Sequence, residues 1–152
     1  MTNIKQVYSA HDRWRKSIRG DKTEMQGLVE KLEEHKYAYF SITNCEKTTL
    51  EDIFFAHLES INMLNTFPTV LVMNSTYKTN MYRMPLFENV GVTSTNMTYF
   101  VVFSFLASEK EGNFTWVLEM LVGLFSSKLN MPKVVITDRW QCSDESCCQS
   151  SP

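Results

Sequence analysis

Two apolar runs, each ending on a polar residue, dominate the hydrophobic pattern of the chain. The run at 69–73 shows no alternation with polar positions and directly follows Pro68. Such a run is typical of a central strand that is covered on both faces. A second run, at 133–137, ends on Asp138, as the first ends on Asn74. The pattern therefore predicts two buried strands that deliver two polar side chains to one site.

Upstream of the first run, local signals predict a helix, a hairpin and a second, shorter helix. Thr23 and Gln26 form a capping box at the start of the first helix. The apolar positions that follow at helical spacing are Met25, Leu28, Val29 and Leu32. Aromatic and β-branched residues at 37–42 predict a strand, and residues 50–56 its hairpin partner. Together these segments predict a helix–hairpin–helix lead-in over residues 1–67.

Downstream of the first run, residues 82–93 and 97–106 predict two strands joined by a turn. With the central strand they make an antiparallel meander of three, in which Gly91 suits a bulge. Asn113 is expected to cap the N-terminus of a helix from 114 to about 125. The second apolar run then lies parallel to the first, because a crossover helix is the expected connection between parallel neighbours.

Aromatic residues in this part of the chain have two interpretations. They are Phe100, Phe103, Phe105, Trp116 and Phe125. Base stacking on such side chains would indicate nucleic acid. Their positions on apolar strands and on a helix face favour core packing instead.

Composition supports one folded domain and limits its partners. The 152 residues are 43% hydrophobic and 12% aromatic, which is enough for a core. A formal net charge of −2 argues against a strongly basic nucleic-acid binder, although a local patch could still act. We find no secretory signal and no apolar run long enough to span a bilayer. We therefore expect an intracellular protein with no membrane partner.

A basic segment at 5–20 is the candidate nucleic-acid contact. Arg13, Arg15, Lys16 and Arg19 surround Trp14 there and could contact a phosphate backbone. The alternative is a solvated helix face or connector without a partner.

Other candidate ligands are weaker. His57 has no Cys or acidic partner at metal spacing, so a surface histidine at an element boundary is the favoured interpretation. Cys142, Cys147 and Cys148 lie close together, but they form no paired C-x-x-C units. Shifting a back-translation of residues 140–152 by one nucleotide gives an amphipathic helical sequence. We therefore expect this Cys- and Ser-rich tail to be a frameshift product, which sequencing of the locus and transcript would test.

Several words of the sequence resemble the catalytic domain of Mutator-like (MULE) transposases, and most closely the plant far-red-impaired-response proteins derived from them. These words are VLVMNSTYKTNMYRMPLFENVGVTST, the helix opening FTW, and VVITDR. The resemblance runs from about Lys5 to Arg139, with the partial core at 68–139. It implies an α+β or α/β fold, a ribonuclease-H-like core with a three-strand antiparallel meander, a crossover helix and a parallel fourth strand. The chain is expected to be a truncated form of this core.

The resemblance also implies a metal site, in which three carboxylates hold two divalent ions, Mg²⁺ or Mn²⁺. The first carboxylate falls on position 74, which is Asn here, the second falls on Asp138, and the third lies beyond the last residue. Hard divalent ions need anionic oxygens. If the loss of charge raised the barrier by about 4 kcal/mol, the rate would fall roughly a thousandfold. We therefore expect no enzymatic activity and no bound cofactor, with Asp138 as a relic of the metal site or a local cap.

The predicted function follows from the same resemblance. The family implies nuclear, DNA-linked regulation of transcription, and this chain is expected to be a catalytically degenerate fragment whose DNA contact comes through its relatives. An alternative is an interaction module that pairs with intact family members. A second alternative is an active metal-dependent transposase or nuclease.

Overall fold

The computed structural model describes residues 4–20, 23–44, 46, 49–77, 80–127 and 131–138. Over these residues the fold is mixed α+β, with four helices and a six-stranded sheet. The chain divides into two compact units, Met1–His35 and Lys36–Pro152. The boundary expected at 67/68 falls inside the second unit. The expected tail at 140–152, with its three cysteines, lies outside the described residues.

The first unit consists of two helices, α1 (Ile4–Arg19) and α2 (Glu24–Glu34). The backbone N–H of Gln26 donates to Thr23 Oγ1 (3.2 Å), and the Thr23 N–H donates to Gln26 Oε1 (2.9 Å). The predicted capping box is therefore confirmed, because both reciprocal bonds form. None of the helices in the described ranges has the length and apolar content to cross a bilayer.

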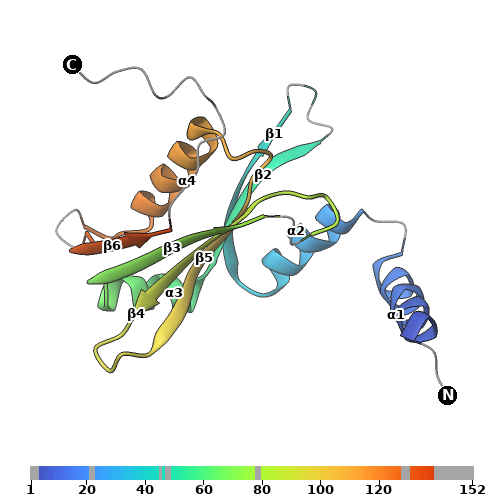
Figure 1. Ribbon diagram of the computed structural model, residues 1–152, viewed down its shortest axis with the longest axis horizontal. Helices are drawn as coiled ribbons and strands as arrows, with labels where there is room; N and C mark the ends of the chain where they lie inside the picture. The colour runs from blue at the N-terminus through green and yellow to red at the C-terminus, as the bar shows by residue number, and fades with distance from the viewer. Residues whose placement is uncertain are drawn as a thin grey trace. The chain divides into compact units, whose positions relative to one another are not determined.

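The second unit contains the sheet and two helices (Figure 1). In chain order its elements are β1 (Tyr37–Thr43), β2 (Leu50–His57), α3 (Leu58–Thr66), β3 (Val70–Thr76), β4 (Leu86–Val92), β5 (Thr98–Phe105), α4 (Glu111–Gly123) and β6 (Val134–Thr137). The strand order across the sheet is β1-β2-β5-β4-β3-β6. Every neighbouring pair is antiparallel except β3 and β6, which are parallel.

This topology confirms the predicted hairpin, meander and parallel pair. The hairpin also joins the meander in one sheet, because β2 pairs with β5 and sets Phe54 opposite Ser104. One strand is shorter than predicted, since β4 begins at Leu86 rather than at residue 82. The segment before it is a turn built on Asn80, whose Nδ2 donates to Met84 O (2.7 Å) and whose Oδ1 accepts from two backbone N–H groups.

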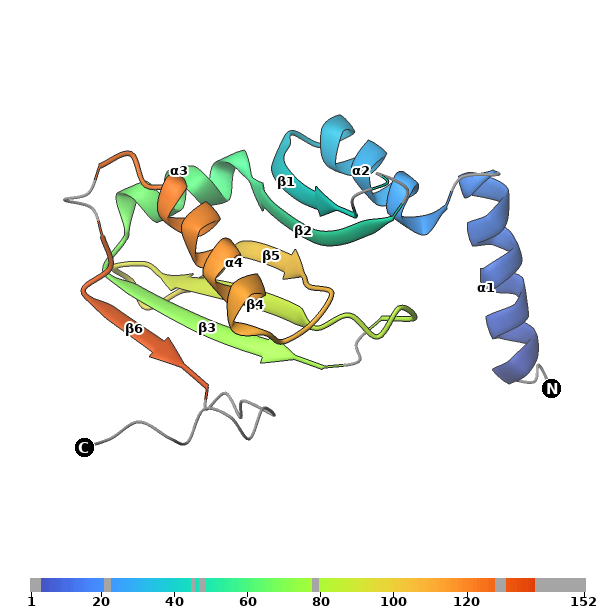
Figure 2. The same cartoon turned by 90° about the horizontal axis from the view of Figure 1, so that it is seen from above.

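Helix α4 crosses one face of this sheet, and the core lies between them (Figure 2). Side chains from both layers form a single buried cluster: Phe54, Ala56, Leu64, Leu71, Met73, Phe87, Val101, Val102, Leu106, Phe114, Val117 and Leu121. On β3, Leu71 and Met73 are buried, whereas Val70 and Val72 are only half-buried. The expectation of a central strand covered on both faces is therefore wrong, because the face with Val70 and Val72 is only partly covered.

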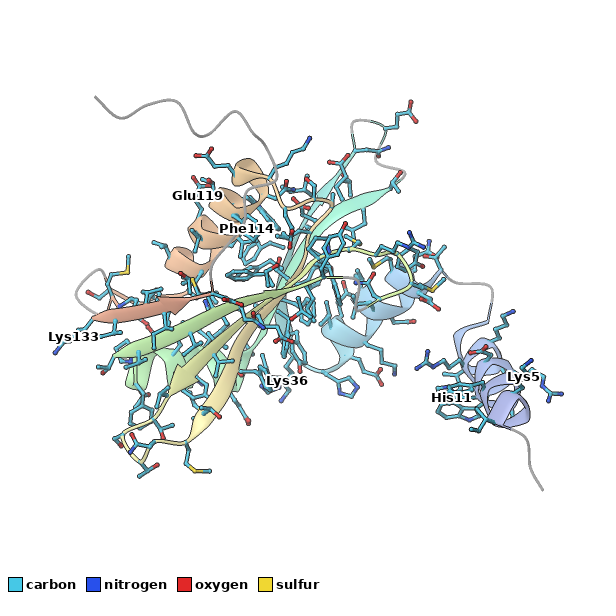
Figure 3. All side chains as sticks on the ribbon, in the orientation of Figure 1. Lys5, His11, Lys36, Phe114, Glu119 and Lys133 are labelled. Atoms are coloured by element: carbon cyan, nitrogen blue, oxygen red, sulfur yellow. The ribbon has the colours of Figure 1, made fainter. Side chains whose placement is uncertain are left out.

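Polar side chains hold both ends of α4. The helix begins at Glu111, and its N-cap, Lys110, makes no side-chain cap bond, so the predicted N-cap role of Asn113 is wrong. Asn113 Nδ2 instead donates to the buried Asp52 carboxylate of β2 (2.8 Å). At the other end, Asn65 of α3 donates to Leu124 O and accepts from the Ser126 N–H. Figure 3 shows the side chain of Phe114 toward the sheet and that of Glu119 away from it.

The aromatic residues divide between the core and the half-exposed face of the sheet. Trp116 and Phe125 pack against the core, as predicted. Phe103 and Phe105 lie outside the buried cluster and Phe100 is 54% exposed, so the prediction of core packing is wrong for these three residues. The Phe100 ring lies 5.0 Å from that of Phe103, which in turn stacks on Phe55 at 5.8 Å between centroids. These contacts join aromatic rings of β2 and β5 on the face opposite the buried cluster.

Gly91 lies beneath a tyrosine ring rather than at a bulge. The irregularity between β4 and β5 falls at Asn89/Val90, and Gly91 pairs directly with Tyr99. A Cβ at position 91 would meet Tyr99 Cζ at 2.4 Å. Burial raises the pKa of the Tyr99 hydroxyl, which donates to Phe67 O (3.4 Å). The glycine therefore provides the space in which this ring packs.

We expect Gly91→Ala to lower the free energy of unfolding by about 1–2 kcal/mol, because the new methyl group displaces the Tyr99 ring. Urea unfolding followed by circular dichroism measures this change. Gly112→Ala is the matched control, since nothing lies within 4 Å of its added Cβ and the site is helical. The control should be neutral or stabilising by up to about 1 kcal/mol. Equal midpoints for the two variants would contradict the packing role of Gly91.

Candidate functional site

The two polar residues predicted to meet at strand ends do lie side by side. In the parallel pair of β3 and β6, Met73 is opposite Thr137, so Asn74 and Asp138 occupy the next pair of positions. The Asp138 N–H donates to Met73 O (3.4 Å), which extends the ladder by one step. Asn74 itself lies within β3, which continues to Thr76, rather than at the strand's exit.

The face on which Asn74 lies follows from the alternation of β3. Leu71 and Met73 point into the core, so Asn74 lies on the opposite face of the sheet. Its Nδ2 donates to Thr76 Oγ1 (3.3 Å), the next residue along the strand on that face. The amide is half-buried, and this bond is local, within β3. Asn74 was expected as a strand-end residue bonding to nearby backbone, but it lies inside β3 and bonds to a side-chain hydroxyl.

A carboxylate that the sequence analysis missed lies across from Asn74. Glu88 of β4 is the direct antiparallel partner of Asn74, so the two residues share one face of the sheet. Asp138, Asn74 and Glu88 therefore form one row across three neighbouring strands, β6, β3 and β4. Only the register of β3 and β4 reveals this neighbour, and the sequence alone gave no signal for that register.

The other side of the same strand end carries a second polar contact. Ser75 Oγ donates to Glu109 Oε1 (3.1 Å), which belongs to the segment between β5 and α4. Ser75 pairs with Phe87, whose side chain is in the core, so this contact lies at the end of the α4-covered face. The end of β3 is therefore bordered by carboxylates on both faces. Glu88 and Asp138 flank the Asn74 amide on one face, and Glu109 contacts Ser75 at the other.

These residues do not fit the metal site that the resemblance implies. Within the described ranges, no group of three or more His, Cys, Asp or Glu side chains is placed to hold a metal ion. The row through Asn74 supplies two carboxylates from strands that are not neighbours, separated by a neutral amide. An amide oxygen gives a divalent ion no charge. We therefore derive no chemical step through a metal at this site.

The remaining candidate residues lie elsewhere in the fold. Arg13, Arg15 and Lys16 are exposed on α1, in the other compact unit, and Arg19 ends that helix with its side chain outside the described part. His57 is at the boundary of β2 and α3, where its Nδ1 accepts from the Glu59 N–H (3.2 Å). The boundary position predicted for His57 is confirmed.

The sheet and its paired strand ends define a mixed α+β domain with a polar row at the junction of two parallel strands. The chain belongs to the MULE transposase domain family, since the profile of that domain matches residues 70–152. The family predicted from the motif words is thus confirmed, and it is a transposase-derived family.

Two similar proteins come from Arabidopsis thaliana. Protein FAR1-RELATED SEQUENCE 11 is 26% identical over 113 residues, which cover 74% of this chain and 16% of the relative. Protein FAR1-RELATED SEQUENCE 5 is 25% identical over 126 residues, which cover 80% of this chain and 15% of the relative. The chain thus spans about a sixth of the length of these curated relatives. No solved structure matches it.

Proposed function

We propose that this chain is a catalytically inactive, transposase-derived domain that takes part in DNA-linked regulation of transcription in the nucleus. The observation that carries the proposal is the amide at position 74, which lies beside Asp138 and donates to Thr76. A ribonuclease-H-like arrangement of the sheet is part of the proposal. It is supported by the meander, the connecting helix α4 and the parallel strand β6.

Inactivity is the part of the proposal that the site chemistry supports most directly. Two-metal catalysis stabilises both the attacking and the leaving oxygen between divalent ions, which carboxylates hold. In this chain the row supplies Glu88 and Asp138 on either side of a neutral residue. Without an anionic oxygen at position 74, neither flanking carboxylate has an adjacent charged partner on β3 with which to hold an ion.

The nuclear and DNA-linked part of the proposal rests on family membership. The basic residues Arg13, Arg15 and Lys16, exposed on α1, support a contact with phosphate groups. Pairing with intact relatives is the second candidate function. It is favoured by the edge strand β6, on which Val134, Val135 and Ile136 are each about half exposed.

We expect Asn74→Asp to bind Mn²⁺ at least about tenfold more tightly than the unmodified chain, because it adds a charge between two carboxylates. Isothermal titration calorimetry with Mn²⁺ measures the gain. Asn96→Asp is the matched control, since it adds the same charge on the exposed turn between β4 and β5. The unmodified chain should leave duplex DNA uncut in Mg²⁺ or Mn²⁺. Cleavage that is lost in Asp138→Asn would overturn the proposed inactivity.

A further inference from the structure

Helix α1 carries a row of large apolar side chains that is exposed along its whole length. Ile4, Tyr8, Trp14 and Ile18 are 72%, 67%, 60% and 63% exposed. At 3.6 residues per turn these four positions fall within about 120° of the helix circumference. Single exposed apolar residues are ordinary, but a continuous row marks an interaction surface. We call these four residues the α1 stripe.

The opposite side of α1 is basic. Lys5, Arg13 and Lys16 fall within a separate band of about 80°, whereas Arg15 falls within the arc of the stripe. Figure 3 shows Lys5 and His11 projecting from different sides of the helix. Residues 4–19 contain five basic residues and one acidic residue, a formal charge of +4 with histidine neutral. Since the whole chain carries −2, the other residues together carry −6.

Within the first compact unit the four side chains of the α1 stripe stay exposed. Polar residues of the helix make local hydrogen bonds, such as Arg13 Nε to Ser9 O (3.2 Å) and Ser17 Oγ to Trp14 O (2.7 Å). Trp14 stacks on His11 within the same helix, with 6.1 Å between ring centroids. A short helix is only marginally stable in isolation, and in proteins it gains most of its stability by packing an apolar face against another surface. The α1 stripe is therefore suited to packing against a further apolar surface.

Three classes of partner carry the negative charge that a basic helix attracts, and they differ in what they offer the stripe. The phosphates of DNA bind the basic band but leave Ile4, Trp14 and Ile18 in water. An anionic bilayer covers the stripe, but its charge extends beyond the helix and repels the remaining residues, which carry −6. A protein groove with an apolar floor and carboxylates at its rim matches both sides of α1 and confines the negative charge to the helix.

We propose that α1 is a docking helix that inserts the stripe into an acid-rimmed apolar groove of a partner protein. Ile4, Tyr8, Trp14 and Ile18 are the anchors, at i, i+4, i+10 and i+14. Lys5, Arg13 and Lys16 contact the carboxylates at the rim. This inference is independent of the strand-end site and of the proposed inactivity, since it uses only residues of the first compact unit. It assigns Arg13 and Lys16 to carboxylates in place of the phosphate contact considered above, and the DNA titration below decides between the two.

Calmodulin loaded with Ca²⁺ is the probe, because its methionine-lined, acid-rimmed groove accepts basic amphipathic helices of varied sequence. The whole 152-residue chain is titrated with it by isothermal titration calorimetry. We expect saturable 1:1 binding that disappears when EGTA removes Ca²⁺ and closes the groove. Trp14→Ala and Ile18→Ala should each weaken binding about tenfold or more. Met97→Ala is the matched control, since Met97 is 66% exposed and lies outside α1.

Parallel titrations with a short DNA duplex and with phosphatidylserine-containing vesicles separate the three partner classes. Absence of binding to Ca²⁺-calmodulin would overturn the proposal, as would binding that Trp14→Ala and Ile18→Ala leave unchanged. Binding only to DNA or only to vesicles would assign α1 to that class instead. Far-UV circular dichroism of each variant tests whether the helix is retained. If one substitution removes the helix, the other still provides the comparison with Met97→Ala.

Discussion

Replacing Asp52 with alanine should lower the free energy of unfolding by about 3–4 kcal/mol, a large loss for a single polar substitution. The Asp52 side chain is 97% buried and accepts two hydrogen bonds, from the Ala107 N–H (2.7 Å) and from Asn113 Nδ2 (2.8 Å). Alanine removes the protein acceptor of both donors. Because Ala107 follows β5 and Asn113 lies in the first turn of α4, the loss detaches the helix start from the sheet.

Urea unfolding monitored by fluorescence measures this loss, and thermal scans should show a fall in Tm of about 10 °C. Glu51→Ala is the matched control, because Glu51 is the exposed neighbour on the same strand, and its effect should stay within about 0.5 kcal/mol. Asp52→Asn should cause an intermediate loss of unfolding free energy. Its amide oxygen can still accept one hydrogen bond, but its NH₂ group faces the other donor, either the Ala107 N–H or Asn113 Nδ2. If Asp52→Ala and Glu51→Ala unfold at the same urea concentration, the carboxylate does not hold α4.

The opposite change is expected at Asn89, where Asn89→Val should raise the free energy of unfolding by about 2–3 kcal/mol. Asn89 is fully buried on β4, between Met73 of β3 and Val102 of β5. Neither Nδ2 nor Oδ1 of its side chain has a hydrogen-bond partner. Valine has a similar volume, suits a strand, and removes both unsatisfied groups.

The gain should appear as a rise in Tm of about 5–10 °C. Asn89→Asp serves as the paired variant: it keeps the shape of the side chain but adds a buried charge, so it should unfold more readily than the unmodified chain. A Tm that stays the same or falls in Asn89→Val would mean that the amide is hydrogen-bonded in solution, by water or by a bound group.

Local signals in the sequence were sufficient for most elements of the fold. The capping box at Thr23 and the apolar stripe after it predict α2 because both depend on residues a few positions apart. Aromatic and β-branched residues likewise mark β1 and β2, and the hairpin needs only a short turn. The motif words correctly identified positions 74 and 138 as neighbours, and the register of β3 and β6 brings them together.

The errors arise where a residue distant in sequence decides the outcome. Asn113 has the residue type of an N-cap, but Asp52, which is 61 positions away, takes its amide. Glu88 was missed because its position opposite Asn74 depends on the register of β3 and β4. The extra residues assigned to β4 belong to the Asn80 turn, whose side-chain bonds replace strand pairing.

The candidate site was predicted only in part for the same reason. Sequence spacing gave the two strand ends, and the alternation of β3 places Asn74 on the half-exposed face once the core is known. The unsatisfied amide of Asn89 has no local signal at all, since an asparagine between phenylalanine, glutamate and valine could lie on either face. Only the cross-strand pairing with Met73 and Val102 shows that position 89 points inward.

Strand β6 contributes no buried side chain, and this has a consequence for how long Asp138 stays beside Asn74. All four residues from Val134 to Thr137 are exposed, so the strand is held by its backbone ladder to β3. Each such bond contributes only about 1 kcal/mol net. In native-state amide exchange, β6 should therefore open on its own, at a free-energy cost well below that of the β3–β4–β5 core. Asp138 therefore lies beside Asn74 only while β6 is paired with β3. The exchange rate of the Asp138 amide measures the fraction of molecules in which this pairing is open.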